Sequence, residues 1–256
     1  MDQGRTEYTI QSVDKAFELL ELLSEPTGGL SLPALSLKIG ASRNKTFRLL
    51  TTLCQKGLVE KDPATGSYRL GLSSAALGQK FVNNCSLTNH AHPILEELAK
   101  RHDEAMYMTV MNDCDVLFLD MVDCHQNIKA APFVGKKIPF FTNAAGKAMK
   151  ALDSRDLLEK LLKRKDIKNI APDLDKLEYE LRDIRMKGVA VDTGGLGEGI
   201  ITVAVAIKDY AGKVVGAITM LGPSFRMLTE RLEREIIPSM LEEAEQLSQK
   251  FGYAPA

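Results

Sequence analysis

The first 70 residues carry three short helical patterns followed by two short strand patterns, an order that few folds share. Ser12 can cap a first helix, and Ser31 can cap a second helix that Gly40 ends. Ser42 then opens a third helix, which Gly57 closes. Only a few residues separate the second helix from the third, as a helix-turn-helix requires.

Apolar residues recur at helical spacing in each segment and predict the faces that turn inward. They are Val13, Ala16, Phe17, Leu19, Leu20 and Leu23, then Leu32, Leu35 and Ile39, then Phe47, Leu49, Leu50 and Leu53. Residues 58–61 and 67–70 follow as strand patterns around a Pro/Gly turn, which predicts a β-hairpin. The complete order is that of a winged helix-turn-helix.

Charge is unevenly distributed, although the whole chain of 256 residues has a net charge of only -1. Residues 38–69 hold seven basic side chains against two acidic ones, which makes a local basic face. Several polar residues gather at the start of the third helix, the end that enters the major groove in a helix-turn-helix. They are Ser42, Arg43, Asn44, Lys45, Thr46 and Arg48.

The segment 42–54 is therefore predicted to be a recognition helix. Arg43, Lys45 and Thr46 are expected to carry much of the base recognition, and an asparagine beside them can read adenine. Arg48 is expected to lie on a phosphate or to pack inward.

The hairpin 58–70 is predicted to be the wing. Its Lys61 and Arg69 are expected near the DNA backbone, where contacts carry no base code. A helical module that contacts protein instead of DNA remains an alternative reading of this region.

Beyond the hairpin the apolar period alternates between helical and strand-like, which predicts an α+β fold. The expected strands are 106–110, 116–122, 128–134, 188–193, 200–208 and 214–221. The expected helices are 73–101, 144–152, 154–162, 173–187 and 229–251. The predicted domains are residues 1–71, a linker helix at 72–86, and a second domain at 87–256.

Signatures of catalysis are missing from the sequence: it has no nucleophile elbow, Walker loop or dinucleotide fingerprint. The glycine-rich stretch 192–199 precedes a β-branched strand pattern instead of a helix, so a loop is expected there and not a phosphate cradle. The histidines and cysteines lack metal-ligand spacing, so neither a metal nor a cofactor is expected. Without a secretory signal or a membrane-length apolar run, a cytoplasmic location is expected and a membrane partner is not.

The run 143–147, Asn-Ala-Ala-Gly-Lys, places small residues at a helix start. Such residues let a ligand approach backbone N–H groups, and the helix dipole favours an anion there. A small acid bound at Ala144 and Ala145 and a tight packing corner are equally open readings of this run.

An ordered set of motifs covers nearly the whole chain. It comprises SVDKAF at 12–17, RLLxxLxxxGLVE at 48–60, YRLG at 68–71, PILxxL at 93–98, GKxIP at 135–139, AGKA at 145–148, GVAVD at 188–192, and Gly222-Pro223 with Arg226 and Leu228-Thr229. In this order the set resembles IclR-type transcriptional regulators. The resemblance implies a winged-helix DNA-binding domain, a linker helix, and a GAF/PAS-like α/β effector-binding domain. It also implies dimers, or dimers of dimers, on operator DNA.

The resemblance further implies which residues line the effector pocket. They are the helix-start residues Ala144 and Ala145, the acid Asp192, the inward strand positions Thr202, Thr219 and Leu221, and the apolar wall residues Ala130 and Ile138. Members that bind very small keto acids tend to have Cys or Ser at three of these positions, so a less polar pocket is expected here. A small carboxylate with an apolar or aromatic body suits this set, with its acid group at the helix start and Asp192 opposite.

The sequence therefore predicts a ligand-responsive transcriptional regulator, a repressor or an activator, of catabolic genes. Its expected partners are operator DNA, a small carboxylate effector, and further copies of itself that contact one another through the first helix and residues 73–81. Two alternatives stand beside this reading. One is a metabolite-binding protein whose N-terminal module contacts protein, and the other is an enzyme acting at the Asp192 loop.

Overall fold

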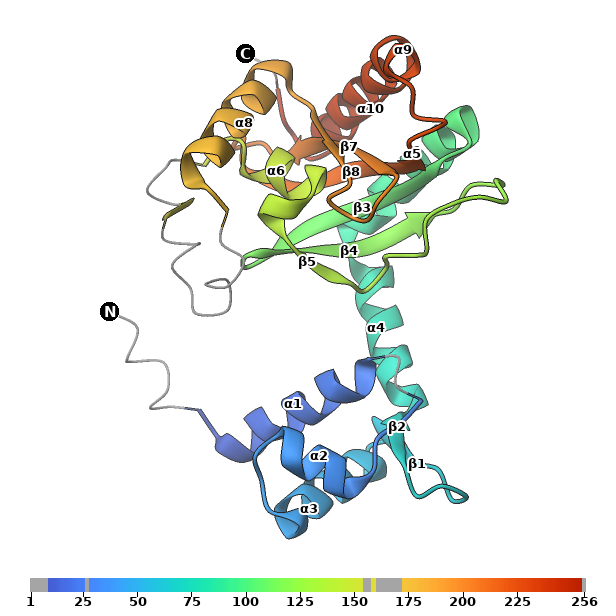
Figure 1. Ribbon diagram of the computed structural model, residues 1–256, viewed down its shortest axis with the longest axis vertical. Coiled ribbons are helices and arrows are strands. Elements are labelled where there is room, and N and C mark those ends of the chain that lie inside the picture. The colour runs from blue at the N-terminus through green and yellow to red at the C-terminus, as the bar shows by residue number, and fades with distance from the viewer. Residues whose placement is uncertain (1–8, 26–27, 154–157, 160–171, 255–256) are drawn as a thin grey trace. The chain divides into compact units, whose positions relative to one another are not determined.

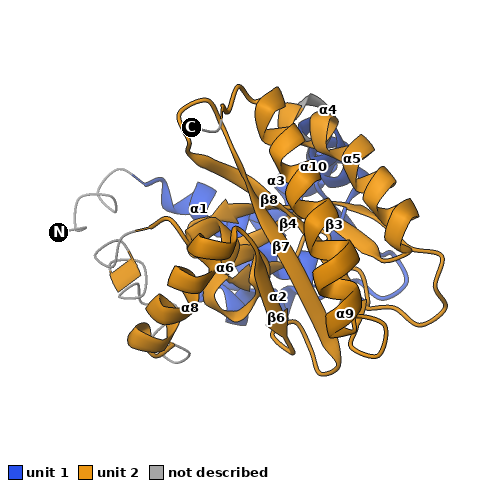
Figure 2. Cartoon of the chain, turned by 90° about the horizontal axis from the view of Figure 1, so that it is seen from above, with its two compact units in different colours: residues 1–84 blue, residues 85–256 orange. Residues whose placement is uncertain are grey.

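The computed structural model describes residues 9–25, 28–153, 158–159 and 172–254 (Figure 1). The chain forms two compact units, Met1–Asn84 and Cys85–Ala256 (Figure 2). Each unit has a hydrophobic core of its own, so each fold is explained by its own residues.

The first unit is a winged helix-turn-helix, as predicted. Its elements are α1 (Gln11–Ser24), α2 (Leu32–Lys38), α3 (Arg43–Gln55), β1 (Val59–Lys61), β2 (Tyr68–Leu70) and α4 (Leu72–Asn84). The strands β1 and β2 pair antiparallel, with Val59 opposite Leu70. The core consists of Leu19, Leu23, Leu35, Ile39, Leu50, Leu53, Val59 and Tyr68.

The helix starts in this unit differ partly from the prediction. The Ser42 hydroxyl accepts a hydrogen bond from the Lys45 N–H at 3.3 Å and caps α3 as expected. Ser31 occupies the N-cap position of α2, but its side chain makes no capping bond. The predicted cap at Ser12 is wrong, because the carbonyl of Ile10 already accepts the first helical bonds and α1 begins one residue before Ser12.

The second unit is built on a six-stranded antiparallel sheet in the order β5-β4-β3-β8-β7-β6. The strands are β3 (Ala105–Asn112), β4 (Asp115–Val122), β5 (Lys137–Pro139), β6 (Ala190–Thr193), β7 (Ile200–Lys208) and β8 (Val214–Pro223). The helices are α5 (Ser86–His102), α6 (Ala144–Lys150), α8 (Leu174–Lys187), α9 (Thr229–Arg231) and α10 (Ile237–Lys250). A 3₁₀ turn, Phe140–Thr142, precedes α6, and a π-helical segment, Leu232–Ile236, joins α9 to α10.

Helices cover both faces of this sheet (Figure 2). The helices α5 and α10 pack on the face that carries Met106, Met108 and Val203. The helices α6 and α8 cover the other face, which carries Ala105 and Tyr107. Because both faces are covered, most of β3 is buried on both sides instead of alternating between buried and exposed.

One predicted strand is wrong and one predicted helix falls outside the described residues. The segment 128–134 is irregular, and the strand lies at β5 instead. The carbonyl of Ile128 accepts from the Arg226 guanidinium at 2.8 Å, and that of Phe133 accepts from the Lys136 N–H at 2.9 Å, so the backbone here bonds to a side chain and a turn. The helix predicted at 154–162 lies mostly outside the described residues.

Candidate DNA interface and effector site

Burial divides the residues of α3 into a packing face and an exposed face. Thr46, Leu50 and Leu53 form the packing face at spacings of four and three residues. Thr46 is fully buried, and its hydroxyl donates to the carbonyl of Ser42 at 3.0 Å. The prediction that Thr46 reads a base is therefore wrong, because its side chain holds α3 in the core.

The exposed face of α3 carries the other predicted residues, Arg43, Asn44, Lys45 and Arg48. Asn44 and Arg48 are four residues apart and share one side of the helix. The alternative that Arg48 packs inward is wrong, because its side chain is exposed. Arg43 lies beside α2, in a hollow that Pro33 also lines.

Phe47 is a candidate interface residue that the sequence analysis placed in the core. Its side chain is 49% exposed and lies next to Arg48 along the helix. Thr46, Leu50 and Leu53 already form a complete inward-facing stripe at helical spacing. Because Phe47 is not part of that stripe, the spacing could have indicated that Phe47 is exposed. An exposed aromatic ring on such a helix can contact a thymine methyl group.

The two predicted wing cations have different surroundings. The Arg69 Nε lies 2.5 Å from Glu60 Oε1 in an exposed ion pair across the hairpin. The Lys61 Nζ lies 5.6 Å from the centre of the Tyr68 ring, and no carboxylate of the described residues forms a salt bridge with it. Lys61 is therefore the freer of the two cations for a phosphate.

The strand register of the second unit brings together the predicted effector residues. Asp192, Thr202 and Leu221 are direct neighbours across β6, β7 and β8. Thr219 lies in the next row of the same face, between Ala204 on β7 and Tyr107 on β3. The buried residues Ala144 and Ala145 of α6 cover this face, and Ala130 and Ile138 pack against the same cluster. All eight predicted residues thus border one region.

Two buried hydroxyl groups on this sheet face, those of Tyr107 and Thr202, make no hydrogen bond of ordinary geometry with the described residues. Tyr107 is fully buried and Thr202 is 1% exposed. Burial raises the pKa of Tyr107 to about 12, against the smaller opposite effect of a hydrogen bond with the Phe133 backbone that falls short of that geometry. The phenol therefore stays protonated near neutral pH and can donate a hydrogen bond. Since buried hydroxyls are nearly always bonded, this pair indicates a place for the polar atoms of a ligand.

Aromatic rings surround the Tyr107 phenol. The centre of its ring lies 5.4 Å from that of Phe118 in an edge-to-face arrangement, and Phe118 lies 5.3 Å from Phe133. These residues lie on the face of β3 opposite to the predicted inward positions Met106, Met108 and Val110, and were not predicted. A sequence signal for this face was present: Tyr107 and Thr109 place polar groups at alternate positions of a strand that is otherwise rich in methionine.

Asp192 does not stand opposite α6, as the sequence analysis expected. Its Oδ1 lies 3.0 Å from Lys147 Nζ of α6, and its Oδ2 accepts from the Gly195 N–H at 2.9 Å. Lys147 also lies 3.0 Å from Glu180 on α8. Burial lowers the pKa of Lys147, but hydrogen bonds to Glu180 and Asp192 outweigh it and raise that pKa. Asp192 therefore joins the glycine-rich loop to α6.

The glycine-rich segment is a loop between β6 and β7, as predicted. The Gly194 N–H closes it by donating to the Ile200 carbonyl at 2.9 Å. A Cβ on Gly195 would lie 1.9 Å from the carbonyl oxygen of Thr142, so only glycine fits where this loop meets the turn before α6. The loop thus closes one side of the candidate site.

In the part of the chain that the structure describes, no group of three or more His, Cys, Asp or Glu side chains could hold a metal ion. None of the described helices is both long enough and apolar enough to span a membrane.

The winged helix-turn-helix and the helix-covered sheet with its buried hydroxyls define a ligand-binding transcriptional regulator. Family models agree: the model described as "Bacterial transcriptional regulator IclR C-terminal" matches residues 79–249, and "IclR helix-turn-helix domain" matches residues 12–63. The chain belongs to the IclR family of transcriptional regulators.

Individual relatives match over most of their length. The chain is 28% identical over 250 residues to the HTH-type transcriptional regulator BhcR of Paracoccus denitrificans, covering 96% of this chain and 88% of that protein. It is 28% identical over 251 residues to the transcriptional repressor IclR of Escherichia coli, covering 95% and 90%. The crystal structure of an IclR regulator from Alicyclobacillus acidocaldarius shares the fold, with a TM-score of 0.83 at 24% identity and coverage of 94% and 99%.

Proposed function

We propose that this regulator binds operator DNA through the exposed face of α3, and that its affinity for DNA changes when a small carboxylate binds to the second unit. The main support for DNA binding is that Leu50 and Leu53 pack α3 into the core, while Asn44, Lys45 and Arg48 on the same helix are exposed. Its targets are genes for the breakdown of the compound that it senses, and it acts in the cytoplasm, where that DNA lies. It works as a regulator, and Asp192 at the glycine-rich loop is not left free as a catalytic base, since both of its oxygens are bonded within the protein.

The proposed effector has an apolar or aromatic body, which the rings of Phe118 and Phe133 favour. Its acid group takes hydrogen bonds from the Tyr107 and Thr202 hydroxyls and from backbone N–H groups at the start of α6. The first helical bond there joins the Lys147 N–H to the Asn143 carbonyl, so the N–H groups of Ala144 and Ala145 come before it. Asp192 is left out of the ligand contacts, because both of its oxygens are bonded within the protein.

Alanine replacement of Asn44 or Arg48 tests the DNA interface. Each change is expected to weaken binding to a selected operator by about tenfold or more, since one lost base contact costs ~1–3 kcal/mol. If the replaced residue contacts a base, the variant also loses its preference for that base at one position of the operator. Fluorescence anisotropy with duplexes selected from random DNA measures both effects. Lys56→Ala, at the far end of α3, is the matched control and leaves binding unchanged.

Lys61→Ala gives the contrasting result for a phosphate contact. Binding to all duplexes weakens alike, and the dependence of log affinity on log salt becomes shallower by about one unit. Unchanged affinities for both α3 variants at moderate salt would show that another surface reads the DNA.

Assembly into at least a dimer is also proposed, because an operator with two half-sites is bound by two DNA-binding domains, one from each chain. Exposed apolar side chains support a contact through Val13 and Phe17 on α1 and Leu77 and Phe81 on α4. Light scattering is expected to give at least twice the 28.2 kDa mass of one chain. Phe17→Glu shifts the protein toward the monomer, whereas Tyr179→Glu, at an aromatic residue of α8 that is also exposed, does not. A monomer at micromolar concentration, with and without DNA, contradicts the proposal.

A further inference from the structure

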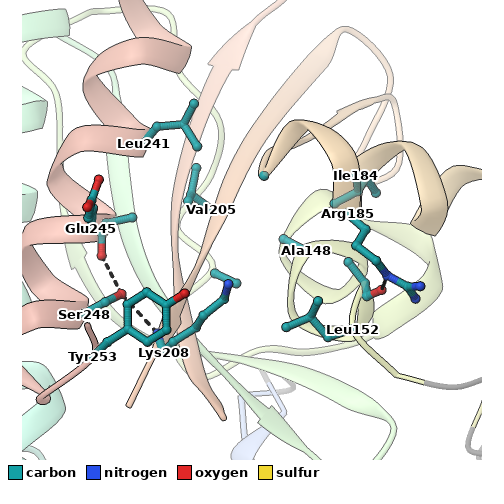
Figure 3. A pocket seen from close by; sticks show the side chains of 14 residues that line it. Ala148, Leu152, Ile184, Arg185, Val205, Lys208, Leu241, Glu245, Ser248 and Tyr253 are labelled. Carbon is teal, nitrogen blue, oxygen red and sulfur yellow. Dashed lines mark hydrogen bonds between the residues drawn. The ribbon is translucent and has the colours of Figure 1, made fainter. Parts of the chain in front are cut away.

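A second cavity lies at the edge of the sheet in the second unit, beyond the part of β7 that pairs with β6. Figure 3 shows it between α10 on one side and α6 and α8 on the other, with Val205 and Lys208 of β7 between them. Its volume is about 310 Å³, at the lower end of the range for small-molecule pockets. Ala148, Leu152 and Ile184 form one apolar wall, and Leu241 forms part of the other.

The cavity exists because β6 covers only part of the edge of β7. The strand β6 pairs with β7 from Ile201 to Ala204, and β7 continues to Lys208 with no further strand of the described residues on that side. One end of the gap is narrow, since a Cβ on Gly188 would lie 3.4 Å from the Leu241 side chain. The cavity therefore opens over an unpaired stretch of sheet edge.

The floor of the cavity offers backbone hydrogen-bonding groups. The Ile200 carbonyl accepts from the Gly194 N–H, so residue 200 directs its polar groups toward the β6 side. Antiparallel pairing alternates along a strand, so Ala206 directs its N–H and carbonyl toward the same side. Ala206 lines the cavity beyond the last residue that β6 covers.

Two cations stand at the cavity without a carboxylate partner among the described residues. The Lys208 Nζ lies 5.2 Å from the centre of the Tyr253 ring. The Arg185 Nε donates to the Ala151 carbonyl at 2.7 Å, on the opposite wall (Figure 3). Glu245, the acid in the lining, forms no salt bridge with either cation. Cations without a carboxylate partner in the described part of the chain, beside apolar walls, favour an anion with an apolar body.

The backbone N–H of Lys208 is already bonded within the protein, so a ligand would contact its side-chain ammonium group instead. The Ser248 hydroxyl accepts from the Lys208 N–H at 3.1 Å and donates to the Ala244 carbonyl at 2.7 Å. We propose that this cavity is a second ligand site, which takes a small monocarboxylate with an apolar body. The carboxylate contacts Lys208, and the body lies between Ile184 and Leu241.

The probe for this site is 4-bromobenzoate. In crystals grown with it, anomalous scattering is expected to place a bromine between α8 and α10. In calorimetric titrations, Lys208→Met weakens its binding about tenfold, because a hydrogen bond to a charged group is lost. Lys213→Met removes the same charge from the nearby β7–β8 turn, where Lys213 is exposed, and leaves binding unchanged. The neutral 4-bromobenzamide binds about tenfold more weakly than the acid.

Two other outcomes count against the site. A bromine found only beside Thr202 and Thr219, with Lys208→Met titrating like the wild-type protein, overturns the second site and leaves the proposed function standing. Binding at crystal concentration only, with no heat in the titration, also overturns it. A bromine in the cavity together with the Lys208 effect supports the site, even if the effector response proves independent of Ala144.

Discussion

Ala144→Asp is expected to abolish the effector response while operator affinity changes by less than about twofold. Ala144 is fully buried at the start of α6, on the sheet face that carries Thr202 and Thr219. A carboxylate there fills space beside the proposed ligand and repels its acid group, and an unpaired buried charge has no compensating partner. The α3 helix belongs to the other unit, which has its own core.

The measurement is anisotropy of a labelled operator, with and without an acid identified by a thermal-shift screen of organic and aromatic acids. Ala131→Asp is the control, since this alanine is exposed in the loop next to Ala130. Circular dichroism of the variant checks that both units remain folded. A folded variant with a full response would place the effector elsewhere in the second unit.

Glu104→Ala is expected to lower the free energy of unfolding of the second unit by about 3 kcal/mol. Glu104 is 1% exposed, and its two oxygens accept from Arg226 Nε and Nη2 at 2.7 Å each. Arg231 adds a third contact at 3.2 Å. Removing the carboxylate leaves two cations without their partner. Both arginines keep some contact with solvent, so the lower end of the range for buried pairs applies.

Urea unfolding followed by circular dichroism measures this change, with the transition of the second unit fitted separately. Glu230→Ala is the matched control, because Glu230 and Arg234 form an ion pair at 2.9 Å in which both side chains are about three-quarters exposed. It is expected to cost less than about 0.5 kcal/mol. Equal effects of the two changes would mean that the Glu104 cluster adds nothing beyond an ordinary surface pair.

Local patterns were sufficient to predict the first unit and most helices and strands of the second. The Ser42 cap, the 58–70 hairpin and the β3–β4 pair each depend on neighbouring residues, and sequence patterns report such interactions directly. The irregular segment at 128–134 could not be predicted in this way. Its carbonyl at Ile128 bonds to Arg226, a side chain almost a hundred residues away.

The candidate site shows the same division. The family resemblance named eight residues, and the strand register gathers them in one region. The partner of Asp192 lies on α6, 45 residues earlier, so no local pattern revealed it. Tyr107 was hidden for a different reason: both faces of β3 are buried, and alternation alone does not tell which face a ligand would meet.

The π-helical segment Leu232–Ile236 decides how this part of the chain accommodates a change in length. Residues 233–235 are exposed, whereas Ile236 is fully buried and Arg231 contacts Glu104. A π turn holds one residue more than an α-helical turn over about the same rotation. Losing one residue here would therefore leave a regular turn, with Arg231 and Ile236 still facing their partners. The same loss within α10 would rotate one end of that helix against the other by about 100°, so the surface segment tolerates a deletion that the helix after it does not.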